Sequence, residues 1–177
     1  MSTNALECQC VLCHDHDVVY GPDQRIVADV QQHGWHVVKV LDEDLPAGFA
    51  YTVGLSHTHG TAELAMFGLD VRTLHVMLNT LGALAAAGTA LHDGDRSDEV
   101  IEGRSVLLRE IDSAWYPRFF GRALAFHRNS PCQFLQVNWP DAANRFHWDE
   151  QAAHRATQPS LWLRPDDHPD SLWTSAD

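Results

Sequence analysis

The sequence lacks long apolar runs and the common signatures of several enzyme classes. Its longest segment of low polarity, 81–87, is much shorter than the roughly 18 to 20 apolar residues of a transmembrane helix. Residues 1–10 lack the basic and apolar regions of a secretory signal peptide. No G-x-G-x-x-G, P-loop, G-x-S-x-G or H-E-x-x-H motif is present. We therefore expect a cytoplasmic protein that does not enter the membrane and that lies outside the common nucleotide-binding, serine-hydrolase and zinc-protease classes.

Positive charge is also scarce. The chain has 12 Lys and Arg against 24 Asp and Glu, which gives a formal net charge of −12, and Lys39 is its only lysine. Nucleic-acid binding depends on protein cations that replace the counterions of phosphates. No nucleic acid is therefore expected as a partner. A negative surface instead suits a basic protein partner, or simply a well-solvated surface.

The chain has enough apolar residues to build one hydrophobic core. Its 177 residues, 45% of them hydrophobic, are typical of a single globular domain. Short apolar segments between turn residues predict strands at 35–41, 49–53, 63–67, 105–111 and 133–138. The first of these is apolar on both faces, which favours a central strand, and we expect it to pair antiparallel with the second.

Helical periodicity completes the predicted fold. The strongest helix, about 70–88, has Asp70 as its N-cap, one apolar stripe, and Gly88 at its end. A second amphipathic helix is expected at about 115–127, and a shorter N-terminal helix precedes the first strand. The irregular alternation of these elements predicts an α+β fold, in which the two main helices pack on a mostly antiparallel sheet.

Three regions differ in composition along the chain. Residues 1–20 form a segment rich in cysteine and histidine, 21–155 form the single α+β domain, and 156–177 form an irregular tail with tryptophan and proline. Within the domain, the segments 55–61 and 89–103 are predicted to be loops, because they contain glycine and polar residues without a clear period.

Several short motifs are distributed over roughly residues 20–165. They are Gly34-Trp35-His36-Val37-Val38, Phe49-Ala50-Tyr51-Thr52-Val53-Gly54-Leu55, Ala62-Glu63-Leu64, Leu135-Gln136-Val137-Asn138-Trp139-Pro140-Asp141, Phe146-His147-Trp148-Asp149 and Gln158-Pro159. Together they resemble a bacterial family known as domain-of-unknown-function family 4262. Asn144 stands where the family usually has glycine, and asparagine is the residue best able to adopt the same left-handed conformation. The resemblance supports the domain assignment and implies no catalytic residues.

The cysteine-rich segment is the first candidate site. Thiolates and imidazoles are the ligands that tetrahedral zinc prefers, and the C-x-x-C spacing is typical of zinc knuckles. The candidate ligands are Cys8, Cys10, Cys13, His14 and His16. All of the site could come from this segment, or three of its residues could combine with a distant ligand such as Cys132. An iron–sulfur cluster and a terminus without a native metal are the alternatives.

Two further groups could carry chemistry. His57 and His59 lie close to Glu63, so that a carboxylate could complete a metal site or one histidine could act as a general base. Asp141 follows Trp139 and a proline, which could place one carboxylate in an aromatic-walled pocket for a small-molecule ligand. The alternatives are that the histidines only stabilise a turn and that Asp141 only caps one.

These features support three hypotheses for function. The first is a zinc-binding α+β module with a binding or regulatory role. The second is a hydrolase-like enzyme whose pocket lies between His57, Glu63 and Asp141, which requires that the three side chains converge. The third is an acidic protein that binds a basic partner, as toxin-neutralising proteins do.

Overall fold

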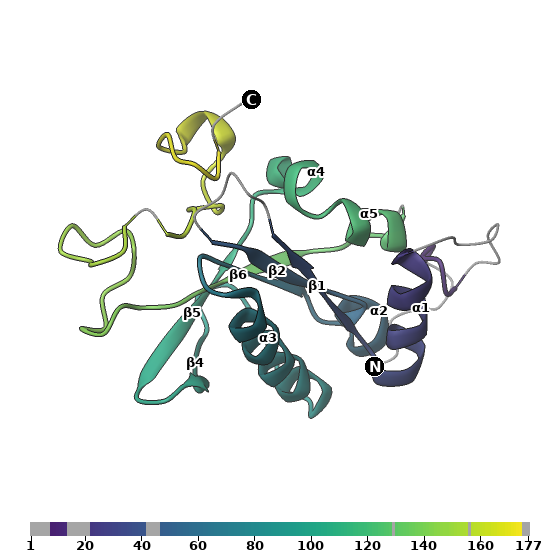
Figure 1. The fold of residues 1–177 in the computed structure, drawn as a ribbon. Coiled ribbons are helices and arrows are strands. Elements are labelled where there is room, and N and C mark those ends of the chain that lie inside the picture. The colour runs from purple at the N-terminus through teal and green to yellow at the C-terminus, as the bar shows by residue number, and fades with distance from the viewer. Residues whose placement is uncertain (1–7, 14–21, 42–46, 129, 156, 175–177) are drawn as a thin grey trace.

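The computed structural model describes residues 8–13, 22–41, 47–128, 130–155 and 157–174. A six-stranded sheet in the order β1-β2-β3-β6-β5-β4 forms its centre (Figure 1). The strands are β1 (His36–Val40), β2 (Phe49–Val53), β3 (Glu63–Phe67), β4 (Arg96–Ile101), β5 (Arg104–Glu110) and β6 (Phe134–Asn138). Neighbouring strands are antiparallel except β3 and β6, which run parallel.

Helices cover both faces of this sheet. They are α1 (Pro22–His33), α2 (Leu55–His59), α3 (Val71–Ala86), α4 (Tyr116–Phe119) and α5 (Gly121–His127), with short 3-10 turns at Ser113–Trp115 and Pro165–Asp167. The apolar stripe of α3 packs on one face, where Leu74, Leu78 and Leu81 are fully buried. The other face lies beneath α1, α4 and α5 and includes the fully buried Phe120. The α+β prediction is confirmed.

Local signals in the sequence place the ends of α3 and one tight turn correctly. The Asp70 side chain accepts a hydrogen bond from the backbone N–H of Arg72 at 2.9 Å, which caps the start of the helix. Gly88 follows the helix with φ +95°, a conformation that glycine adopts without steric cost. Asn144 has φ 60°, so it does adopt the left-handed conformation that its replacement of glycine predicts.

The predicted central position of the first strand is wrong. Strand β1 lies at one edge of the sheet and pairs only with β2 among the described residues (Figure 1). Its Val38 belongs to the core beneath α1 and α5, whereas Val37 belongs to the core beneath α3. A strand covered on both faces is apolar on both sides wherever it stands in the sheet, which explains the error.

Three further predictions of secondary structure also need correction. The segment 89–103, predicted to be a loop, contains the edge strand β4, whose exposed and polar residues show no alternating pattern. The segment 55–61, also predicted to be a loop, contains α2. The helix predicted at 115–127 is interrupted at Phe120, which has φ −118° and ψ 31°, and this break lets Phe119 and Phe120 both enter the core.

The C-terminal segment packs against the sheet through a buried amide. The Gln136 side chain of β6 donates to the carbonyl of Pro159 at 2.6 Å and accepts from the N–H of Leu161 at 3.1 Å. Leu161 is fully buried and Trp173 is 1% exposed, so both belong to the core of the domain. In the part of the chain that the structure describes, no helix has the length and apolar character needed to cross a membrane.

Candidate metal centre

The cysteine segment is attached to the end of α5. The backbone N–H of Val11 donates to the carbonyl of Phe126 at 3.0 Å, and the N–H of Gln9 donates to Ser130 Oγ at 2.6 Å. The N–H of Cys13 donates to the carbonyl of Cys10 at 3.1 Å, so the C-x-x-C step forms a tight turn. Cys10 is fully buried and belongs to the core, which fixes the segment on the body of the domain.

His57 reaches the cysteines from the short helix α2. Gly54 and Gly60 flank this helix with φ +107° and +65°, which allows the chain to turn sharply before and after a single helical turn. The His57 ring also contacts Phe126 edge-on, with the ring centres 6.3 Å apart. The side chain thereby projects from the sheet body toward the cysteine segment.

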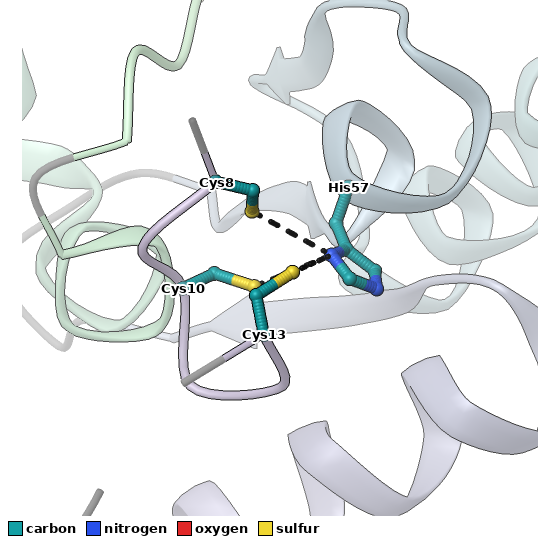
Figure 2. Close-up of side chains that lie close together, drawn as sticks. All are labelled: Cys8, Cys10, Cys13 and His57. Atoms are coloured by element: carbon teal, nitrogen blue, oxygen red, sulfur yellow. Dashed lines mark hydrogen bonds between the residues drawn. The ribbon is translucent and has the colours of Figure 1, made fainter. Parts of the chain in front are cut away.

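Four side chains converge on one point (Figure 2). His57 Nδ1 lies 3.8 Å from the sulfur of Cys8, 3.2 Å from that of Cys10 and 3.6 Å from that of Cys13. All four ligand atoms lie within 4.8 Å of one another, so the group could hold a metal ion. A neutral imidazole Nδ1 has either one hydrogen or one lone pair, so hydrogen bonding alone cannot satisfy three sulfurs at once.

The electrostatics of the three thiols differ although they share one site. Burial raises the pKa of Cys8, but hydrogen bonds from His57 and its other neighbours outweigh it, and the net pKa lies below the usual value. Burial, together with the adjacent Cys8 and Cys10 sulfurs, raises the pKa of Cys13 to about 12. One negative charge is therefore favoured among the sulfurs, and further charges repel it. A bound cation would remove this repulsion.

Glu63 is the side chain that orients the helix of His57. Its carboxylate is fully buried and accepts hydrogen bonds from five donors. These are Thr52 Oγ1 at 2.7 Å, the N–H groups of Gly54, Leu55 and Ser56 at 2.8, 3.3 and 3.1 Å, and His127 Nε2 at 2.9 Å. Burial raises its pKa, but the bond and charge of His127 and the remaining donors lower it further, below the usual value. Glu63 is thus an ionised cap for the N-terminus of α2.

A second group of possible ligands lies behind this cap. Glu63, His127 and Cys132 also lie within 4.8 Å of one another. Both oxygens of Glu63 are already engaged by protein donors, and burial, with the nearby charge of Glu63, raises the pKa of the Cys132 thiol. These conditions disfavour a thiolate and a free carboxylate, so the group supports the structure of α2 rather than a second ion.

The candidate catalytic residues do not converge. Glu63 is aligned with Phe134 at the start of β6, whereas Asp141 follows the end of that strand, about 13 Å or more away at the usual rise per residue. Asp141 accepts from the N–H groups of Ala153, Arg145 and Ala143, which lower its pKa to about 2. It caps a turn, and the predicted pocket between His57, Glu63 and Asp141 is not formed by the described residues.

The sequence does not predict the fourth member of the metal group, His57, as a ligand of the cysteine site. His14 and His16, which the sequence suggests, lie outside the described residues, and Cys132 lies in the other group. For His57, the sequence predicts only a role as a general base or as a metal ligand beside His59 and Glu63. The one signal for its role is that a histidine stands in a glycine-flanked turn, and that signal does not show which distant segment the ring meets.

Of the comparisons with known proteins, one gives a match. No curated protein and no solved structure matches the chain. The model of the family described as "Domain of unknown function (DUF4262)" matches residues 29–153, which include all six strands and α2, the helix of His57. The chain therefore belongs to the DUF4262 family.

Proposed function

We propose that this protein is a zinc-binding domain, in which Cys8, Cys10, Cys13 and His57 hold one structural Zn²⁺ ion and the assembled domain has a binding role. The observation that carries this proposal is the placement of one imidazole nitrogen opposite three sulfurs. A tetrahedral zinc with Zn–S near 2.3 Å and Zn–N near 2.0–2.1 Å separates the nitrogen from each sulfur by about 3.6 Å. The three separations in this protein are 3.8, 3.2 and 3.6 Å.

The donor set favours zinc and a closed site. Three thiolates with one imidazole form a common structural zinc set, whereas Mg²⁺ and Ca²⁺ prefer oxygen ligands. Catalytic zinc sites usually retain a position for water, whereas four protein ligands would fill the tetrahedron here. The ion would therefore fasten the cysteine segment to α2 without activating a substrate.

The hydrolase-like alternative has less support. It needs His57 as a base, and the Nδ1 atom of that ring faces the sulfurs. It also needs Asp141 beside Glu63, and the two lie at opposite ends of β6. A binding role is consistent with a closed metal site, and with buried carboxylates that serve as caps.

Elemental analysis of untagged protein, purified without added metal or chelator, tests the proposal. We expect about one zinc per chain, and a loss of zinc in His57→Asn and in Cys10→Ser. His59→Gln is the matched control, because it changes the same residue type on the same helix outside the group, and it should retain zinc. Metal-free wild-type protein would refute the proposal, and iron with visible absorbance would replace zinc by an iron–sulfur centre.

A further inference from the structure

A groove runs along β1, the outermost strand of the sheet among the described residues. Its floor is formed by residues 35–39, and its volume is about 690 Å³. Helix α1 contributes Arg25, Asp29 and His33 to one wall, together with Arg122 of α5, and α3 contributes His75 and Asn79 to the other. Figure 1 shows β1 at the edge, with α1 and α3 on either side of it.

The groove reverses the charge of the rest of the protein. Three of the 12 cations of the chain, Arg25, Lys39 and Arg122, line it, and all three are exposed. Its one carboxylate, Asp29, is already engaged by His36 Nδ1 at 2.6 Å and by Arg25 Nε at 3.9 Å. Among the described residues, Lys39 and Arg122 have no carboxylate partner. In a chain of net charge −12, this local excess of positive charge favours an anionic partner.

The cations lie on both sides of the strand edge. Lys39 shares the sheet face of Val37, beneath α3, because alternate residues of a strand point to the same face. Arg25 and Arg122 belong to α1 and α5, which pack on the opposite face. An added strand also points consecutive side chains to opposite faces. Two adjacent acidic residues on such a strand would therefore reach Lys39 and the two arginines at once.

The backbone of β1 provides the remaining contacts. An edge strand leaves the N–H and C=O groups of alternate residues unpaired, and these groups are a template for another strand. From this edge and its charges, we propose that β1 binds an extended acidic peptide segment of another protein, which adds to the sheet as a seventh strand. This proposal goes beyond the metal site, because no groove residue belongs to the metal group.

A second copy of this chain fits the groove less well. Two-fold pairing of β1 with β1 would bring Lys39 and the two arginines of each copy toward those of the other, and like charges in contact oppose association. An acidic segment meets the same cations with complementary charge. Lys39 alone could also serve only to prevent edge-to-edge aggregation, as charged residues on edge strands do. The experiment separates these possibilities.

Fluorescence anisotropy with labelled octapeptides tests the proposal on the full zinc-loaded chain. The probe is Val-Glu-Glu-Val-Glu-Glu-Val-Glu, and the controls are the same sequence with lysine or glutamine in place of glutamate. A further control is the glutamate peptide N-methylated throughout, which retains its charges and loses its backbone donors. We expect binding of the first peptide only, weakened by salt, and weakened about tenfold or more in Lys39→Glu and Arg122→Glu. Arg164→Glu, an exposed change outside the groove, should bind as wild type does.

Each other result overturns the proposal. Equal binding of the N-methylated peptide, or full competition by citrate, would show a site for anions without strand addition. No binding of any peptide would mean that Lys39 serves only to prevent aggregation at the edge of the sheet. A wild-type dimer in sedimentation, whose association competes with the glutamate peptide, would make a second copy the occupant. Circular dichroism of each variant checks that loss of binding is not loss of fold.

Discussion

The proposed zinc ion should stabilise the domain mainly by joining two segments that are far apart in the chain. Cys13 and His57 are 44 residues apart, so the ion would close a loop of this length in the folded chain. For an ion that stays bound after unfolding, the chain-entropy relation for a cross-link of this length gives a loss of about 13 cal/mol/K, which corresponds to about 4 kcal/mol at 25 °C. An ion released on unfolding contributes its binding free energy instead, which is larger for structural zinc, so about 4 kcal/mol is the smaller of the two values. Cys8 and Cys10 close longer loops to the same histidine, of 49 and 47 residues, so this value is not reduced by the other ligands.

Urea unfolding of the untagged protein, with and without a zinc chelator at neutral pH, measures this contribution. For wild type, the chelator should lower the free energy of unfolding by at least about 4 kcal/mol, and the melting temperature by at least about 8 °C for a chain of this size. His57→Asn should already have the lower stability and should not respond to the chelator. His59→Gln lies on the same helix, outside the metal group, and should respond as wild type does.

Two results would refute the reasoning. A loss below about 1 kcal/mol in chelated wild-type protein would mean that the cysteines and His57 do not close the loop through an ion. An equal response of wild type and His57→Asn would mean that the chelator acts on metal bound elsewhere. Either outcome is distinct from a change in the denaturant slope, which would indicate altered compactness of the unfolded chain.

Three further changes probe the supports of the fold. Glu63→Gln should lower the free energy of unfolding by about 3 kcal/mol and weaken zinc retention, because an amide cannot accept all five bonds of the buried carboxylate; urea unfolding and zinc competition measure both effects. Burial lowers the pKa of His147 to about 4, so this side chain is protonated at a higher pH in the unfolded chain than in the folded one. About 3 kcal/mol of the free energy of unfolding should therefore be lost between pH 7 and pH 4. Denaturation at both pH values should show a smaller loss in His147→Gln. Gly68→Ala should cost about 3 kcal/mol in urea unfolding, because its Cβ would lie 2.1 Å from the Thr157 carbonyl oxygen. Gly94→Ala, with φ +85° and open space around it, should cost only about 1 to 2 kcal/mol.

The sequence predicts those elements whose signals are local. The N-cap at Asp70, the stripe of α3 and the glycine after it depend on residues within a few turns, and all are observed. Strand β4 escapes prediction because it is an exposed edge strand without an apolar face. The edge position of β1 is not predicted for a different reason. Apolar residues on both sides of a strand indicate that both of its faces are covered, but they do not indicate how many strands it pairs with. Lys39, an exposed charged residue within β1, is typical of an edge strand.

The metal group also combines a signal that is local in the sequence with one that depends on tertiary structure. The C-x-x-C spacing of Cys10 and Cys13 indicates a metal-binding turn without any knowledge of the fold. His57 enters only through tertiary structure, because its distance from the cysteines along the chain carries no spacing rule. The role of Glu63 is also tertiary, since a glutamate at the start of a strand gives no sign that it will accept bonds from three successive backbone N–H groups.

The two halves of the metal group are held by different means, which determines what removal of the ion should change first. An isolated helix of five residues is unstable, so the position of His57 depends on the buried Glu63 carboxylate and on the sheet that carries it. The described part of the cysteine segment is held to the domain by the bond from the Val11 N–H to the Phe126 carbonyl and by that from the Gln9 N–H to Ser130. In chelated protein, hydrogen exchange at Val11 should therefore accelerate strongly, while the N–H of Gly54, bonded to Glu63, should remain protected. Equal acceleration at both amides would mean that the ion holds α2 as well, and that Glu63 does not position His57 independently of the metal.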